Sequence, residues 1–273
     1  CEFGRPRIPW PSGLPGIEIE THSEFWSDQI ALIGRLEKTM TLRRFVSCRF
    51  VSRSLVAASM VLAVSFVRAD DHKLSAVKKG PEGLSPAIEK LLDTNGHQIS
   101  GPDGPVVEVW LLKGIEVKEK FKPSALQQYP LIPGQLLGAM RISKAADDYT
   151  DFRGQQMSAG TYTLRYGLQP QDGNHVGTSD TYDFMLALPA KSDVKTTPIK
   201  DFRELAEISA KAAGSTHPAI FSLLDPKTAS KEAKLTQDDF TEHWILNLQS
   251  QAKAKDKAVD LKIRLVVVGK SEG

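Results

Sequence analysis

Residues 160–168 alternate strictly between apolar and polar side chains. One face of this segment holds large apolar residues, namely Tyr162, Leu164, Tyr166 and Leu168. The other face holds Thr161, Thr163 and Arg165. Because successive side chains of a β-strand point to opposite sides, this period of two predicts a strand that is buried on one side. Residues 259–268 alternate in the same way and predict a second strand of this kind.

Further runs of β-branched, aromatic and aliphatic residues predict strands over 106–112, 135–142, 181–188, 219–224 and 242–248. Two short helices are also expected. The first begins at Ser85-Pro86 and ends at Asn95-Gly96, and the second covers 201–213. These helices do not alternate with the strands as βαβ units would. The pattern therefore predicts a mainly β fold, an antiparallel β-sandwich of Ig-like or jelly-roll-like type with two short helices.

Residues 40–69 have the three parts of a secretory signal peptide. Arginines follow Met40, an apolar run of about 12 residues covers 55–66, and Val67-Arg68-Ala69 forms a cleavage site of the small-x-small type. A bilayer-spanning helix needs roughly 20 apolar residues, so cleavage near Ala69 is favoured over a membrane anchor. We therefore expect a periplasmic or secreted protein without a transmembrane segment in the mature chain.

This signal divides the chain into four expected parts. Residues 1–39 are interpreted as an upstream extension from a mis-assigned start, and residues 40–69 as the signal peptide. Residues 70–99 are expected to form a tether and a short helix, and residues 100–273 a β-sandwich domain. Both cysteines, Cys1 and Cys48, precede the expected cleavage point. The mature chain would therefore contain neither disulfides nor a catalytic thiol.

Charge composition excludes one class of function. The whole chain has 35 Lys+Arg and 33 Asp+Glu residues, a formal net charge of +2, and no dense basic block. Nucleic-acid binding depends on a concentrated positive surface, so we expect no nucleic-acid partner. The chain also lacks Walker, G-x-G-x-x-G, G-x-S-x-G and H-E-x-x-H motifs. These absences favour a non-enzymatic protein.

The densest group of polar side chains lies in residues 169–183, directly after the best-patterned strand. The candidate ligand-binding residues are Gln171, Asp172, Asn174, His175, Asp180 and Asp183. A loop anchored on a rigid strand, with carboxylates, amides and an imidazole, suits a small polar ligand. The segment Asp172-Gly173-Asn174 is equally typical of a turn whose side chains bind only their own backbone.

A metal site is the alternative interpretation of this loop. Imidazoles are ligands for copper and zinc, and the expected domain contains His175, His217 and His243. These three residues with Asp172 are the candidate ligands. No cofactor is predicted otherwise.

Four aromatic residues allow two interpretations. Trp110, Tyr162, Tyr166 and Trp244 could form a sugar-stacking face, but most of them lie on apolar strand faces. We therefore expect them to pack in the core.

The same region carries a resemblance. The segment Ala159–His175, which reads AGTYTLRYGLQPQDGNH, with Asp183-Phe184 after it, resembles a stretch found in a group of uncharacterised secreted bacterial proteins. This resemblance implies an envelope location and a β fold, and it carries no activity with it. The sequence as a whole predicts an exported non-enzymatic binding or structural module of unknown ligand and partner, and a cell-envelope component is one form that such a module could take. The alternative is a metal-binding periplasmic protein or a metal-assisted enzyme centred on residues 169–183.

Overall fold

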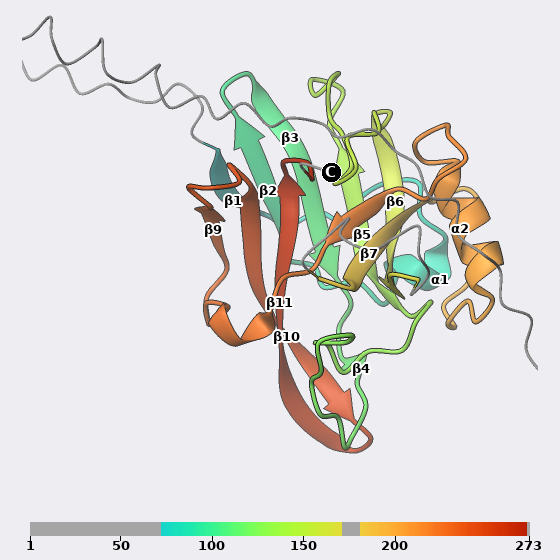
Figure 1. The fold of residues 1–273 in the computed structure, drawn as a ribbon. Helices are drawn as coiled ribbons and strands as arrows, with labels where there is room; N and C mark the ends of the chain where they lie inside the picture. Colours follow the sequence, from blue (N-terminus) through green and yellow to red (C-terminus); the bar gives the residue numbers. More distant parts are fainter. Residues whose placement is uncertain (1–71, 171–180, 272–273) are drawn as a thin grey trace, which may run out of the picture. The chain divides into compact units, whose positions relative to one another are not determined.

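The computed structural model describes residues 72–170 and 181–271, and these form two β-sheets (Figure 1). The larger sheet has seven antiparallel strands, in the order β1 (Lys73–Val77), β2 (Gly96–Gly101), β3 (Gly104–Leu111), β5 (Leu136–Ile142), β6 (Gly160–Leu168), β7 (Asp183–Pro189) and β8 (Ile220–Ser222). The smaller sheet consists of β11 (Lys257–Val268), β10 (Trp244–Ala254), β4 (Ile115–Glu116) and β9 (Lys234–Gln237). In this smaller sheet, β4 runs parallel to β10, whereas β9 and β11 run antiparallel to β10.

The two sheets share one hydrophobic core. The larger sheet contributes Val107, Val109, Met140 and Leu164, and the smaller sheet contributes Leu246, Leu248, Ile263 and Leu265. The last strand of the larger sheet also lies next to β11, since the Leu224 amide donates to the Arg264 carbonyl at 2.9 Å. The expected mainly β, antiparallel class with two short helices is confirmed.

Strand β6 has the predicted core face but differs from the prediction on its other face. Tyr162, Leu164 and Tyr166 are buried in the core, as the alternation indicates. Thr163 and Arg165 were expected on an open face, yet both are 0% exposed. The segment 189–197 covers them, and its Asp193 carboxylate binds both side chains.

The structure corrects part of the tether that was expected before the short helix in residues 70–99. Residues 73–77 form β1, which pairs with β2 from Lys73 opposite Ser100 to Val77 opposite Gly96. Only Leu74 and Val77 of this strand are half-buried and pack against apolar clusters. An edge strand with so little burial has no long alternation for sequence reasoning to detect.

Both helices begin as their capping residues predict. Helix α1 (Pro86–Glu89) starts after Ser85, whose hydroxyl accepts from the Ile88 amide at 3.4 Å. Helix α2 (Phe202–Ala210) starts after Asp201, whose carboxylate accepts from the Arg203 amide at 2.8 Å. Both helices end before the predicted residue. A short 3-10 helix, η1 (Pro226–Thr228), links β8 to β9.

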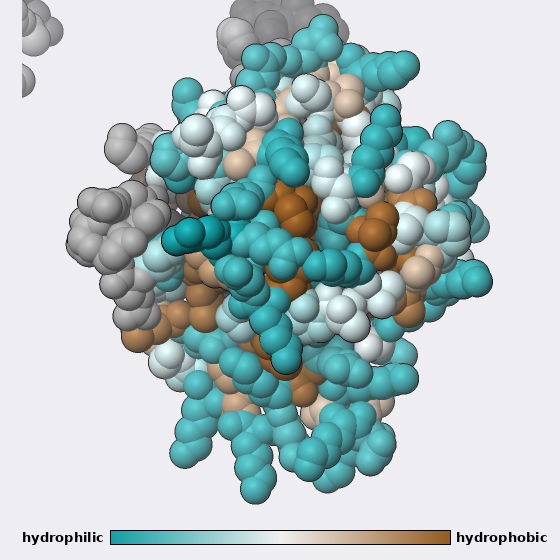
Figure 2. Space-filling model, turned by 90° about the vertical axis from the view of Figure 1, so that its right-hand side faces the viewer, coloured by the Kyte–Doolittle hydropathy of each residue, from teal (hydrophilic) through white to brown (hydrophobic). Residues whose placement is uncertain are grey.

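The face of the molecule that carries α2 is mostly hydrophilic (Figure 2). Hydrophobic residues appear on it as separate small spots among hydrophilic neighbours. Singly exposed apolar residues are ordinary on soluble folds. This face therefore gives no reason to infer a partner.

Candidate functional site

Most of the loop predicted as a site lies outside the described residues. This applies to Gln171, Asp172, Asn174, His175 and Asp180. Asp183 is the one member of the predicted set that the structure describes.

Asp183 is fully buried and is held by three hydrogen bonds. Its Oδ1 accepts from the Tyr166 hydroxyl at 2.5 Å and from the Tyr129 amide at 3.2 Å. Its Oδ2 accepts from the Gln128 amide at 2.9 Å. Burial raises the pKa of the Asp183 carboxyl, while these donors act in the opposite direction. In this arrangement the carboxylate joins β6 and β7 to the segment before Leu131, which is a structural role.

The histidines of the metal hypothesis occupy different environments. His217 is exposed, and its backbone groups bond to the Ser215 hydroxyl. His243 is buried against the Phe152 ring, and its Nε2 lies 2.9 Å from the Lys270 carbonyl. Within 72–170 and 181–271, no group of three or more His, Cys, Asp or Glu side chains could hold a metal ion. The hypothesis also requires His175 and Asp172, which lie outside these ranges.

All four aromatic residues are buried or half-buried, but Trp110 packs with Leu92 and Ala139 on the other side of the larger sheet and not in the core that the two sheets share. Trp110 and Tyr166 are 0% exposed, Tyr162 is buried, and Trp244 is half-buried against the core. None of them forms an open stacking face.

A different set of side chains forms a site on the larger sheet. We call the face of this sheet opposite the shared core its outer face. Four neighbouring strands place a polar residue on this face at the same level, and we call these residues the polar row: Gln98, Glu108, Arg141 and Thr161. The register pairs Gln98 with Glu108, Glu108 with Arg141, and Arg141 with Thr161.

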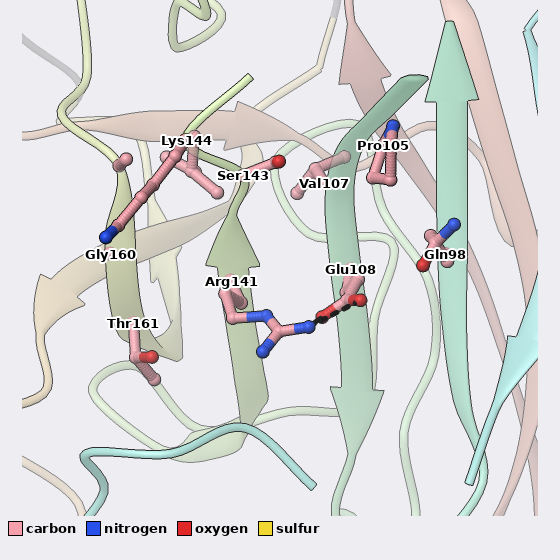
Figure 3. Close-up of a pocket in the computed structure, with 11 residues that line it drawn as sticks. Gln98, Pro105, Val107, Glu108, Arg141, Ser143, Lys144, Gly160 and Thr161 are labelled. Atoms are coloured by element: carbon pink, nitrogen blue, oxygen red, sulfur yellow. Dashed lines mark hydrogen bonds and ion pairs between the residues drawn. The ribbon is translucent and has the colours of Figure 1, made fainter. Parts of the chain in front are cut away.

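An ion pair lies at the centre of the polar row. The Arg141 Nη2 donates to Glu108 Oε1 at 2.7 Å and lies 2.6 Å from Oε2 (Figure 3). The Glu108 side chain is 7% exposed and the Arg141 side chain 44% exposed. The hydrogen bond to Glu108 raises the pKa of Arg141, so the guanidinium stays charged. The pair therefore presents a buried carboxylate beside an accessible cation.

The polar row lines a hollow of about 460 Å³. We use "the hollow" for the space bounded by Gln98, Pro105, Val107, Glu108, Arg141, Ile142, Ser143, Lys144, Ala159, Gly160 and Thr161. Its volume falls within the range of small-molecule sites, about 300–1,000 Å³. In Figure 3 the Lys144 side chain extends toward Gly160, and the Glu108 and Arg141 side chains point toward one another.

The outer face is covered on one side of the polar row. Trp110, two residues after Glu108, and its partner Ala139, two residues before Arg141, pack beneath Leu92, just after α1. Two residues further along β6, Thr163 hydrogen-bonds to Asp193. At the Thr161 end of the row, the Thr161 hydroxyl donates to the Glu82 carbonyl at 2.7 Å. The row thus begins where the cover over Trp110, Ala139 and Thr163 ends.

Sequence reasoning missed Glu108 and Arg141. Each is a charged residue inside an apolar strand, in Val107-Glu108-Val109 and in Met140-Arg141-Ile142. Opposite charges at the outward positions of two strands were the available signal. That signal becomes specific only when the register shows that the two positions are partners.

No protein-family model matches the chain, and no curated protein or solved structure matches it either. The functional argument therefore depends on the geometry of the described residues.

Proposed function

We propose that the chain is an exported, non-enzymatic binding module whose two sheets pack as a β-sandwich, and that it binds a small polar ligand in the hollow. Export is supported by the signal-peptide pattern of residues 40–69. The sandwich is supported by the core that both sheets share. None of the described helices is long and apolar enough to cross a membrane.

The open polar row is the observation that carries this proposal. The next outer-face positions on one side of it, Trp110, Ala139 and Thr163, are covered by other parts of the chain, whereas the row retains an accessible guanidinium and a volume suited to a small molecule. An ion pair built only for stability would contribute little, about 0–1 kcal/mol when one partner is exposed. Convergent polar groups in a partly apolar hollow are typical of ligand sites.

Binding is favoured over catalysis by the kinds of residue in the hollow. The hydroxyls of Ser143 and Thr161 line it, but its lining contains no histidine or cysteine. A serine or threonine nucleophile needs an adjacent base to activate it. Glu108 is engaged by Arg141 and does not hydrogen-bond to either hydroxyl in the structure.

A thermal-shift screen tests the proposal. The purified chain from residue 70 onward is melted with a panel of neutral sugars, sugar acids, amino acids and dicarboxylic acids. A compound present at about 100 times its Kd adds about 2.7 kcal/mol to the stability of the state that binds it. We expect at least one compound to raise Tm for the wild type and for the control variant Arg203→Gln, in which the same charge is removed from exposed α2.

The variants Glu108→Gln and Arg141→Gln should lose this increase while keeping the wild-type circular dichroism spectrum. An increase that all four proteins share would place binding outside the hollow. A panel without any stabilising compound would count against the binding function itself.

A further inference from the structure

We infer that a lysine-rich end of the molecule is a docking surface for anionic phospholipid bilayers. We call this end the basic tip and define it as residues 113–126, which contain β4 and the loop after it, and residues 252–258, which form the end of the β10–β11 hairpin. In Figure 1 the two segments lie together and extend beyond the larger sheet. The basic tip is separate from the hollow, so this inference does not depend on the proposed ligand site.

Backbone hydrogen bonds hold the two segments of the basic tip together. Strand β4 pairs in parallel with β10. The Val117 amide continues this pairing, since it donates to the Lys253 carbonyl at 2.9 Å. The Lys118 amide donates to the Pro130 carbonyl at 2.8 Å and closes the loop that follows β4. Segments that lie far apart in the sequence therefore form one surface.

The positive charge of the described chain is concentrated in the basic tip. Residues 72–170 and 181–271 contain 26 Lys+Arg and 22 Asp+Glu residues. The tip holds seven of these basic residues and three of the acidic ones, whereas the remainder of the described chain holds 19 of each. All seven are exposed lysines: Lys113, every second residue of 118–122, and every second residue of 253–257. The net charge of +4 in the described chain is therefore the charge of the tip.

Few of these lysines are neutralised by neighbours. The Lys255 ammonium lies 3.0 Å from the Glu119 carboxylate, and this is the one ion pair of the tip among the described residues. The Lys118 ammonium donates to the Gln127 side chain at 3.1 Å and lies 5.7 Å from the centre of the Phe121 ring. The tip thus keeps a positive field that attracts a negatively charged partner.

Apolar side chains beside the lysines favour a bilayer over a purely polar anion. Backbone hydrogen bonds between Ser124 and Gln127, at 2.9 and 3.2 Å, close a tight turn that contains Leu126. The exposed fraction of Leu126 is 44%, and the Phe121 ring is half-buried beside the Lys118 ammonium. On segments that bind bilayers, lysines attract the lipid phosphates while leucine and phenylalanine enter the boundary of the acyl chains.

The composition of the basic tip is less suited to nucleic acid. The tip contains no arginine, the residue whose planar fork binds phosphates and base edges through two hydrogen bonds. Its one aromatic ring, Phe121, is half-buried and lies beside a lysine, whereas base stacking requires an open ring face. Lysines that act as point charges on a projecting surface fit an extended negative layer.

Vesicle co-sedimentation tests the inference. The protein is the chain from residue 70 onward, which contains both sheets. The probes are vesicles of pure phosphatidylcholine and vesicles that also contain about 30% phosphatidylglycerol. We expect binding to the anionic vesicles alone. Raising NaCl from about 0.05 M to about 0.5 M should weaken this binding about tenfold or more, because salt screens exposed charges.

Two triple variants of equal charge locate the contact. The tip variant replaces three exposed lysines that make no ion pair within the described chain: Lys120→Gln, Lys122→Gln and Lys257→Gln. It should bind the anionic vesicles about 100-fold more weakly, since each lysine near such a surface contributes about fivefold. The control variant removes three exposed lysines in and around α2 and should bind as the wild type does: Lys191→Gln, Lys200→Gln and Lys211→Gln. Both variants should keep the wild-type circular dichroism spectrum.

A further variant and a second probe distinguish the bilayer from other polyanions. Leu126→Ser should weaken vesicle binding severalfold, because its side chain no longer enters the acyl boundary, and should leave weak binding to a short DNA duplex unchanged. Absence of binding to the anionic vesicles would overturn the inference, and so would equal binding by the tip and control variants. A DNA duplex that binds more tightly than the vesicles would identify a nucleic-acid surface instead.

Discussion

Arg165 shows why a charged residue in this chain does not have to face water. It is 0% exposed, and all five of its N–H groups have acceptors. Nε donates to Asp193 Oδ2 at 2.6 Å, and Nη2 donates to Asp193 Oδ1 at 2.9 Å and to the Lys195 carbonyl. Nη1 donates to the carbonyls of Gly134 and Thr197 at 2.8 and 3.0 Å. The alternation of β6 placed Arg165 on the correct face, but burial of that face depends on a segment about 30 residues further along the chain.

Removing the partner of Arg165 should destabilise the protein strongly. The variant Asp193→Ala leaves a buried guanidinium without its counter-ion, which typically costs about 3–5 kcal/mol. The control is Glu204→Ala, which breaks an exposed ion pair with Lys195 and should cost about 0–1 kcal/mol. Urea unfolding measures both values. Equal losses for the two variants would show that the Arg165 site is not buried as described.

His97 should make stability depend on pH. This residue of β2 is half-buried, and burial lowers its pKa below 6.5, although Asp93 acts against the shift. The unfolded chain then binds more protons than the folded chain at mildly acidic pH, so the contribution of His97 is present above its unfolded pKa and is lost as pH falls. Unfolding free energies at about pH 5 and pH 7.5 should differ less for His97→Gln than for the wild type. An unchanged difference would exclude His97 as a source of the pH dependence.

At the scale of elements, the sequence predicted well those strands that contribute most to the core. The apolar periods of β6 and β11 locate these strands because burial on one face imposes them. Strands β1, β2, β4 and β9 were missed. Strands β1, β4 and β9 have only two to five residues each. Strand β2 follows a turn and has few buried residues. Such segments become strands because a neighbour offers its hydrogen-bonding edge, which local pattern does not reveal.

Hydrogen exchange distinguishes strand β1 from a tether. Amides of residues 73–77 that pair with β2 should exchange more slowly than those of an unstructured peptide, because opening them requires β1 to detach from the sheet. Mass spectrometry of the peptic peptide that contains these residues provides the measurement, and the exposed segment 119–126 serves as a fast-exchanging comparison. Exchange of both peptides at the same rate would support the tether and contradict the pairing.

At the scale of the whole molecule, the candidate site depends on which parts of a sheet the rest of the chain leaves open. Sequence reasoning placed the site where polar residues are dense along the chain, in residues 169–183, and most of that loop lies outside the described residues. The polar row is instead spread over about 60 residues and is assembled only by strand register. No local motif contains it, so it could not be predicted without the sheet order.

The most direct test of the hollow as the binding site is an NMR titration. The ¹⁵N-labelled protein is titrated with the panel compound that gives the largest increase in Tm, and backbone amide shifts are followed. The account predicts the largest changes at Gln98, Glu108, Arg141, Ser143 and Thr161, with small changes at Gln169 and Tyr182, which flank the loop of residues 171–180. Largest changes at Gln169, Tyr182 and Asp183, with the polar row unaffected, would contradict it and place the site in the loop.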